Sequence, residues 1–113
     1  MEIIKSSNSN MTKKEIFKMT QNSSNISLKD TEDITINLSG WVLYSDTNSA
    51  GNETELLSII DDQGLVYVTN SQTFRESFMK MVDFCDDDPV SVIKVIHGES
   101  KNGRKFVDCE LVG

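Results

Sequence analysis

An alternation of apolar and polar residues that begins at Ile34 constrains the fold of this chain more than any other feature of its sequence. Ile34, Ile36 and Leu38 alternate with polar residues, Gly40 interrupts the pattern, and the alternation resumes over residues 41–44. A period of two is typical of a half-buried strand, and a glycine inside such a pattern favours a bend or a bulge. We therefore predict one long strand over residues 34–44 that is bent at Gly40.

Two hairpins are predicted after this strand. Residues 55–60 and 65–69 have strand character and are separated by a short turn that contains a glycine. Residues 90–97 and 104–112 also alternate, and the turn between them contains Asn-Gly, the strongest short hairpin signal. The sequence therefore predicts four further strands.

One helix is predicted between the two hairpins. Thr73 and the glutamate three residues later have the spacing of a capping box, which marks the start of a helix. Phe74, Phe78 and Val82 follow at helical spacing and form an apolar stripe that is expected to face the core. Pro89 cannot continue a helix, so the helix is expected to end before it.

The first twenty residues divide into a polar segment and a short helix. Residues 1–10 lack periodicity and are predicted to be a flexible tail. Thr12 and Glu15 have the capping-box spacing, so a short helix is predicted from there to about Thr20. Residues 11–113 then form a single domain with a helical extension, because a chain of 113 residues leaves no room for a second core.

The predicted order of elements is three strands, a helix and two strands. This is the order of the OB fold, a five-stranded Greek-key barrel in which the helix fills the gap between the third and fourth strands. We therefore predict a mainly β, OB-type barrel with a short N-terminal helix. No apolar run is long enough to cross a membrane, and the N-terminus lacks the apolar segment of a signal peptide. A cytoplasmic protein is expected.

The residues that usually carry catalysis or bind metal are sparse. His97 is the only histidine, and no nucleophile motif, phosphate-binding loop or histidine–carboxylate ligand pair accompanies it. Cys85 and Cys109 have no metal-binding spacing and are expected to be reduced and buried. The acidic residues 86–88 lack the alternating spacing of a calcium loop, so a solvated helix end is the simpler interpretation. We predict a protein that is not an enzyme and has no cofactor or metal.

The net charge of −7 argues at first against nucleic acid as a partner. The distribution of the charge matters more, because no lysine or arginine lies between Lys29 and Arg75. The cations gather instead in two groups, Lys13, Lys14, Lys18 and Lys29, and then Lys94, Lys101, Arg104 and Lys105. An anionic partner is therefore expected to be held from these two ends of the sequence.

Three aromatic residues are candidates for stacking with unpaired bases. Val66 and Val68 define the expected core face of their strand, which turns Tyr67 outward. Tyr44 and Phe106 also lie on the faces opposite to the expected core residues of their strands, whereas Trp41, Phe74 and Phe78 are expected in the core. Single-stranded nucleic acid is held by bases that stack on exposed rings and by cations that follow its backbone.

The candidate nucleic-acid contacts are therefore Tyr44, Tyr67, Lys94, Lys101, Arg104, Lys105 and Phe106. The alternative is that these rings only cover the surface of the barrel and that the hairpin cations form a solvated tip.

Residues 95–106 have the sequence Val-Ile-His-Gly-Glu-Ser-Lys-Asn-Gly-Arg-Lys-Phe and follow a predicted helix and a lysine-bearing strand. This stretch resembles the end of the small single-stranded DNA-binding proteins of protein-primed tailed phages of Gram-positive bacteria, and the resemblance extends loosely over residues 34–112. The resemblance implies an OB barrel that coats displaced strands during genome replication without base specificity. It also implies that Lys101, Arg104, Lys105 and Phe106 contact DNA.

Our hypothesis from the sequence is a single-stranded DNA-binding protein that coats and protects displaced strands during phage or plasmid replication. Single-stranded DNA is the expected partner, and replication proteins are compatible with the sequence as further partners. No membrane association is expected, and the sequence is compatible with an oligomer. The alternative is an OB-fold module that binds or regulates a protein partner through its acidic surface. An enzyme that acts on a small substrate is a third hypothesis.

Overall fold

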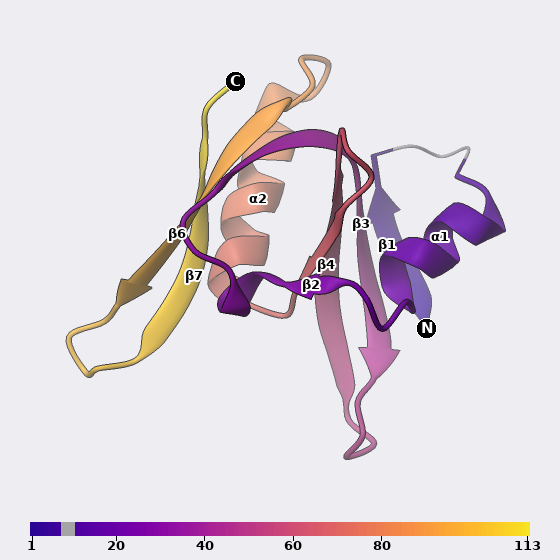
Figure 1. The fold of residues 1–113 in the computed structure, drawn as a ribbon, viewed down its shortest axis with the longest axis horizontal. Coiled ribbons are helices and arrows are strands. Elements are labelled where there is room, and N and C mark those ends of the chain that lie inside the picture. Colours follow the sequence, from indigo (N-terminus) through magenta and orange to yellow (C-terminus); the bar gives the residue numbers. More distant parts are fainter. Residues whose placement is uncertain (8–10) are drawn as a thin grey trace.

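Strand β3 (Thr35–Thr47) is the longest strand in the described residues, and the other strands are arranged around it (Figure 1). The computed structural model describes residues 1–7 and 11–113. Along the chain, the other elements are β1 (Glu2–Ser6), α1 (Lys13–Thr20), β2 (Ile26–Ser27), the 3-10 helix η1 (Leu28–Asp30), β4 (Glu53–Asp61), β5 (Val66–Thr69), α2 (Gln72–Cys85), β6 (Val92–Glu99) and β7 (Lys105–Leu111). Within the described residues, none of the helices has the length and apolar character needed to cross a membrane.

The strands form one sheet that curls into a half-barrel (Figure 1). Their order is β2-β5-β4-β3-β6-β7, and β1 pairs with β3 outside this path. β3 is antiparallel to β4 and, over Thr35 to Asn37, antiparallel to β6. Its register with β4 shifts between Leu38 and Gly40, which confirms the predicted irregularity at the glycine. The mainly β class predicted from the sequence is therefore confirmed at the level of a curled, barrel-like sheet.

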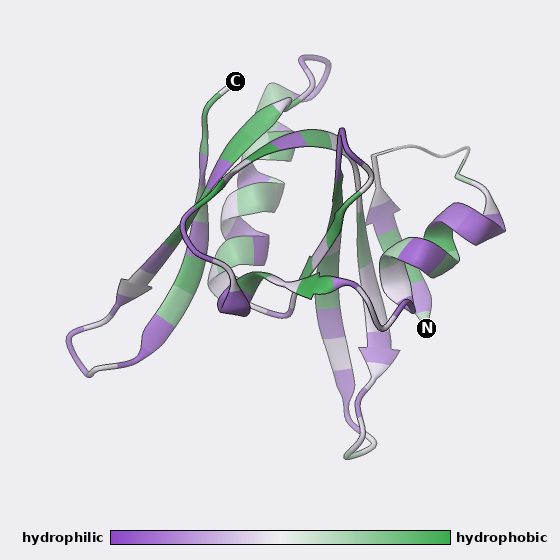
Figure 2. Ribbon diagram, in the orientation of Figure 1, coloured by the Kyte–Doolittle hydropathy of each residue, from purple (hydrophilic) through white to green (hydrophobic). Residues whose placement is uncertain are grey.

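The main core lies between this sheet and α2. Phe74 and Phe78 of α2 are completely buried, and Trp41 of β3 is 8% exposed. The rings of Trp41 and Phe78 meet edge to face with 5.6 Å between their centroids, which is a favourable aromatic geometry. All three residues are in the core, as predicted. Figure 2 shows the same pattern along the chain, with hydrophobic stretches in the strands around α2 and hydrophilic residues at the hairpin ends.

The N-cap of α2 differs from the prediction. Ser71, rather than Thr73, caps the helix, because its Oγ accepts a hydrogen bond from the backbone N–H of Phe74 at 3.2 Å. The same hydroxyl donates to the carbonyl oxygen of Val107 in β7 at 3.1 Å. The hydroxyl of Ser71 therefore makes one local hydrogen bond within the helix start and one to β7, and the second bond depends on tertiary structure.

A second, smaller core cluster lies under α1. Thr12 caps this helix, with its Oγ1 accepting from the N–H of Glu15 at 3.1 Å, so the predicted short helix is confirmed. Met19 is 2% exposed and belongs to the same cluster as Val42. The Oγ of the buried Ser58 in β4 donates to the carbonyl oxygen of Met19 at 2.6 Å. α1 is therefore fixed to the sheet by both packing and a buried hydrogen bond.

The predicted tail of residues 1–10 is wrong for its first part. Glu2–Ser6 forms β1, in which Ile3 pairs with Tyr44 and Ser6 with Val42 of β3. Ile3 is 40% exposed, so backbone hydrogen bonds to β3 hold this strand with little burial of side chains. A strand of this kind leaves no apolar pattern in the sequence. Residues 8–10 of the predicted tail lie outside the described residues.

The prediction that Tyr44 and Tyr67 are exposed rings is also wrong. Tyr44 is 2% exposed in the cluster under α1, and burial is the main cause that raises the pKa of its hydroxyl to about 12. Tyr67 is 9% exposed and belongs to the main core cluster, whereas Val66 and Val68 pack in the cluster under α1. The prediction assumed that only one face of the sheet is covered. Because α1 covers the other face, both sets of alternating side chains are buried.

Candidate nucleic-acid interface

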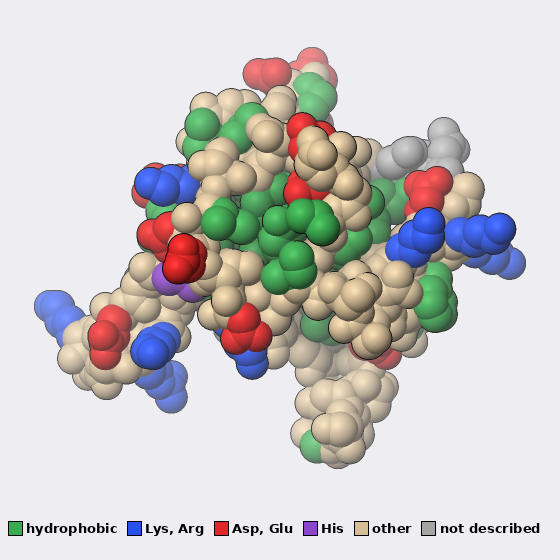
Figure 3. Space-filling view, in the orientation of Figure 1, with side chains coloured by type: hydrophobic (Ala, Val, Ile, Leu, Met, Phe, Trp, Pro, Cys, Tyr) green, Lys and Arg blue, Asp and Glu red, His purple; other side chains and the backbone are tan. Residues whose placement is uncertain are grey.

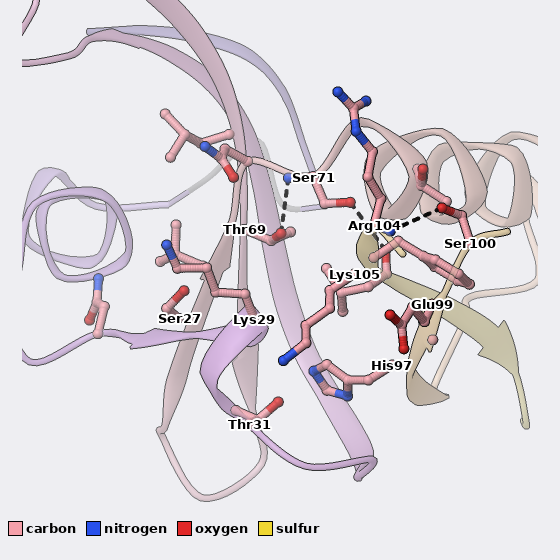
Figure 4. A pocket seen from close by; sticks show the side chains of 18 residues that line it. Ser27, Lys29, Thr31, Thr69, Ser71, His97, Glu99, Ser100, Arg104 and Lys105 are labelled. Carbon is pink, nitrogen blue, oxygen red and sulfur yellow. Dashed lines mark hydrogen bonds between the residues drawn. The ribbon is translucent and has the colours of Figure 1, made fainter. Parts of the chain in front are cut away.

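An open cleft lies between the end of β5 and the β6–β7 hairpin, beside the β2–η1 segment (Figure 4). Its volume is about 1300 Å³. Thr69 of β5 and Leu56 of β4 line one side, and Val107 of β7 lines the other. In the described part of the chain β5 and β7 share no ladder, and the hydrogen bond from Ser71 to Val107 joins the two sides. The cleft therefore occupies the seam where the half-barrel stays open.

Three cations line this cleft from two directions. Lys29 belongs to η1, whereas Arg104 and Lys105 come from the end of the hairpin loop and the start of β7. Figure 4 shows Lys29 on one side of the cleft and Lys105 and Arg104 on the other. Among the described residues none of the three forms an ion pair, and Glu99 is the one carboxylate among the residues that line the cleft. These cations are therefore available to pair with phosphate groups.

Phe106 places an aromatic ring at the same cleft. It is 40% exposed and lies opposite Gly98 in the ladder between β6 and β7. The far end of the ring lies directly over Gly98, and a Cβ at that position would overlap it. The ring therefore depends on a glycine at residue 98 for its position. Its exposed surface is of the kind on which a nucleic-acid base stacks.

His97 holds the wall of the cleft together. Its Nδ1 is 2.8 Å from Oδ1 of Asp33, and its Nε2 is 2.8 Å from the carbonyl oxygen of Leu28 in η1. The backbone N–H of His97 also donates to Asp33 Oδ1 at 2.7 Å. A carbonyl oxygen and an ionised carboxylate only accept hydrogen bonds, so both ring bonds form together when the imidazole is protonated.

The electrostatics of this contact favour that protonated form. The carbonyl of Leu28, followed by the carboxylate of Asp33, raises the pKa of His97. The side-chain and backbone hydrogen bonds from His97 lower the pKa of Asp33. Through these hydrogen bonds His97 fixes η1, and with it Lys29, against β6.

The structure brings together some of the predicted contact residues and separates others. Arg104, Lys105 and Phe106 line the cleft, as expected of one site. Lys101 is exposed in the hairpin loop next to the cleft, without lining it. Lys94 is exposed on β6, opposite Thr35 and Glu110, and is not among the lining residues. Tyr44 and Tyr67 are buried, so they are corrected as stacking residues.

Two residues of the cleft were not predicted as part of the site. Lys29 lies on η1 in a stretch without periodicity, and His97 is paired with residues more than sixty positions away. The sequence contains Lys29 as one of its grouped cations, which was the only available signal. Its position beside the hairpin depends on the hydrogen bonds of His97.

In residues 1–7 and 11–113 no group of three or more histidine, cysteine, aspartate or glutamate side chains could hold a metal ion. Cys109 is buried, and burial raises the pKa of its thiol to about 12, whereas Cys85 is only partly buried, which corrects the expectation for that residue. Figure 3 shows cationic side chains at the hairpin and over α1, with acidic side chains distributed over the whole of this face.

Comparisons with protein-family models, with curated proteins and with solved structures give no match to this chain.

Proposed function

We propose that this chain is a non-catalytic protein that binds single-stranded DNA in the cleft without base specificity. The observation that carries this proposal is the gathering of Lys29, Arg104, Lys105 and the exposed ring of Phe106 in one open cleft of a protein whose net charge is −7. Cations pair with any phosphate, and a ring stacks with any base at about 1–3 kcal/mol per base. A duplex offers no unpaired base and is repelled by the acidic remainder of the protein.

The position of the cleft supports an OB fold as the finer description of the half-barrel. The elements β3, β4, β5, α2, β6 and β7 follow in the order of that fold, and OB folds bind oligonucleotides on their second and third strands and adjacent loops. In this chain the equivalent strands are β4 and β5, which contribute Leu56 and Thr69 to the cleft. The loop between the last two strands contributes Ser100 and Arg104.

The biological role that fits such a site is the coating and protection of displaced strands during phage or plasmid replication. The resemblance of residues 95–106 to phage single-stranded DNA-binding proteins supports this role, because Arg104, Lys105 and Phe106 of that stretch line the cleft. The hydrogen bonds of His97 to Asp33 and Leu28 support a structural rather than a catalytic role for the only histidine.

Binding of a fluorescently labelled oligothymidylate, measured by anisotropy, tests the proposal. A labelled strand is needed because Trp41 is only 8% exposed and does not line the cleft. We expect the single strand to bind more tightly than a duplex of the same length, and Phe106→Ala to weaken binding about 5-fold or more, the lower end of one stacked base. Phe84→Ala is the matched control, since Phe84 is 91% exposed and does not line the cleft. Equal affinity for duplex and single strand would contradict the proposal.

Phe84 also favours the second candidate function, a module that binds a protein partner. Its ring is almost fully exposed at the end of α2, next to the acidic residues 86–88. Exposed aromatic residues are common at protein–protein interfaces. If the chain does not retain oligothymidylate at all, this second function replaces the first.

A further inference from the structure

The outward face of α1 combines cations with an exposed ring. Successive residues of a helix are rotated by about 100°, which places Lys13, Phe17, Lys14 and Lys18 in one continuous arc on the side away from the buried Met19. Phe17 is 58% exposed, and all three lysines are exposed. No ion pair involves these lysines within the part of the chain that the structure describes.

Glu15 in the first turn and Lys18 in the last turn suit the helix dipole, but three other features of this face oppose the stability of a short helix. Lys14 and Lys18 are four residues apart, so their charges repel each other on the helix surface. Lys13 and Lys14 lie in the first turn, where the helix dipole disfavours positive charge. Phe17 leaves apolar surface in water instead of burying it. Residues that locally disfavour the folded structure are expected where they serve binding.

The cleft and α1 meet at Asn25. This residue lines the cleft, and its Nδ2 donates to the carbonyl oxygens of Lys18 at 2.8 Å and Met19 at 3.2 Å. The rim of the cleft is therefore in direct contact with the C-terminal end of α1. Figure 3 shows the cations of the hairpin and those over α1 in one view of the molecule.

We propose that the α1 face, defined by Lys13, Lys14, Phe17 and Lys18, is a second contact site for the same single strand. The inference rests on the proposed function of the cleft, from which the strand continues past Asn25 onto α1. The lysines pair with phosphates, and Phe17 stacks with a base. The helix has 8 residues and is about 12 Å long, so it adds contacts only for strands that extend beyond the cleft.

A comparison of two oligonucleotide lengths separates the α1 face from the cleft. Oligothymidylates of about 5 and about 16 nucleotides lie within the range of site sizes of OB folds. We expect Phe17→Ala to weaken binding of the longer strand about 5-fold or more and to change binding of the shorter strand by less than about 2-fold. The double variant Lys14→Gln/Lys18→Gln should behave in the same way at low salt. Phe84→Ala and the charge-matched Lys5→Gln/Lys80→Gln are the controls, because these exposed residues lie outside both sites.

The possible outcomes distinguish this inference from the function on which it rests. If the parent binds both strands and the α1 variants bind the longer strand like the parent, the α1 face is not a contact site. A concentration-dependent dimer of the parent that is lost in Phe17→Ala, with unchanged DNA binding, would assign this face to a second copy and also overturn the inference. If the parent binds neither strand, the function of the cleft fails, and the inference fails with it. Thermal melting of each variant verifies that the exposed substitutions leave the fold intact.

Discussion

The salt dependence of binding tests the charge of the cleft most directly. For a single strand, each phosphate neutralised by the protein contributes about −0.7 to the slope of log affinity against log salt concentration. The three cleft cations, Lys29, Arg104 and Lys105, therefore predict a slope of about −2 for a strand short enough to occupy the cleft alone. Because Arg104→Gln/Lys105→Gln removes two of the three contacts, we expect the slope to flatten by about 1.4.

The assay is a titration of a labelled oligothymidylate of about 5 nucleotides at several salt concentrations. Phe106→Ala should lower the affinity at every concentration and leave the slope nearly unchanged, because stacking releases no counterions. Lys5→Gln/Lys80→Gln changes the net charge equally but outside the cleft, and it should leave the slope unchanged. An unaltered slope for Arg104→Gln/Lys105→Gln would refute the assignment of the cleft. A control that flattens the slope equally would show that only net charge matters.

Three further predictions concern the fold around the cleft. Phe78→Ala should cost about 3–5 kcal/mol of unfolding free energy, since the ring is completely buried, and an unmoved denaturant midpoint would contradict this. The pKa of His97 is raised in the folded state, so the stability that its protonated ring contributes is complete below the unfolded pKa of about 6.5 and is lost as the pH rises through the folded pKa. The pKa of Asp33 is lowered, so the stability that its carboxylate contributes is lost only in acid. Thermal melts should therefore show that the stability difference between the parent and His97→Gln shrinks as the pH rises from about 6 to about 9. A difference that stays constant over this range would contradict the prediction. Gly98→Ala should displace the ring of Phe106 and weaken oligothymidylate binding, as anisotropy would show, although it changes no charge and leaves the ring untruncated. Unchanged binding would show that the position of the ring does not matter.

The candidate site was predictable only where local sequence determines geometry. The Asn-Gly turn sets the register of the last hairpin, and the alternation along β7 then places Phe106 on the face opposite Val107. Arg104 and Lys105 follow from the same register. No local rule places Lys29 beside them, because its position depends on the long-range hydrogen bonds of His97.

The tyrosines show the corresponding limit for burial. The alternation around Tyr67 predicted correctly that its neighbours face the other way, but it could not indicate whether one or both faces of the strand are covered. α1, which comes from a distant part of the sequence, covers Tyr44, whereas Tyr67 is buried in the main core between the sheet and α2. Burial of a strand residue is thus a property of the elements that pack on it.

By itself, the sequence determined the mainly β class, the irregularity at Gly40, the two helices and the core position of Trp41, Phe74 and Phe78. Each of these depends on periodicity, capping or a turn, which act between residues a few positions apart. Only the tertiary structure decided that Glu2–Ser6 pairs with β3, that the half-barrel stays open as a cleft, and that Lys29 faces the hairpin. These features arise from backbone pairing and contacts between distant segments, which need no particular local pattern of residues and therefore leave none in the sequence.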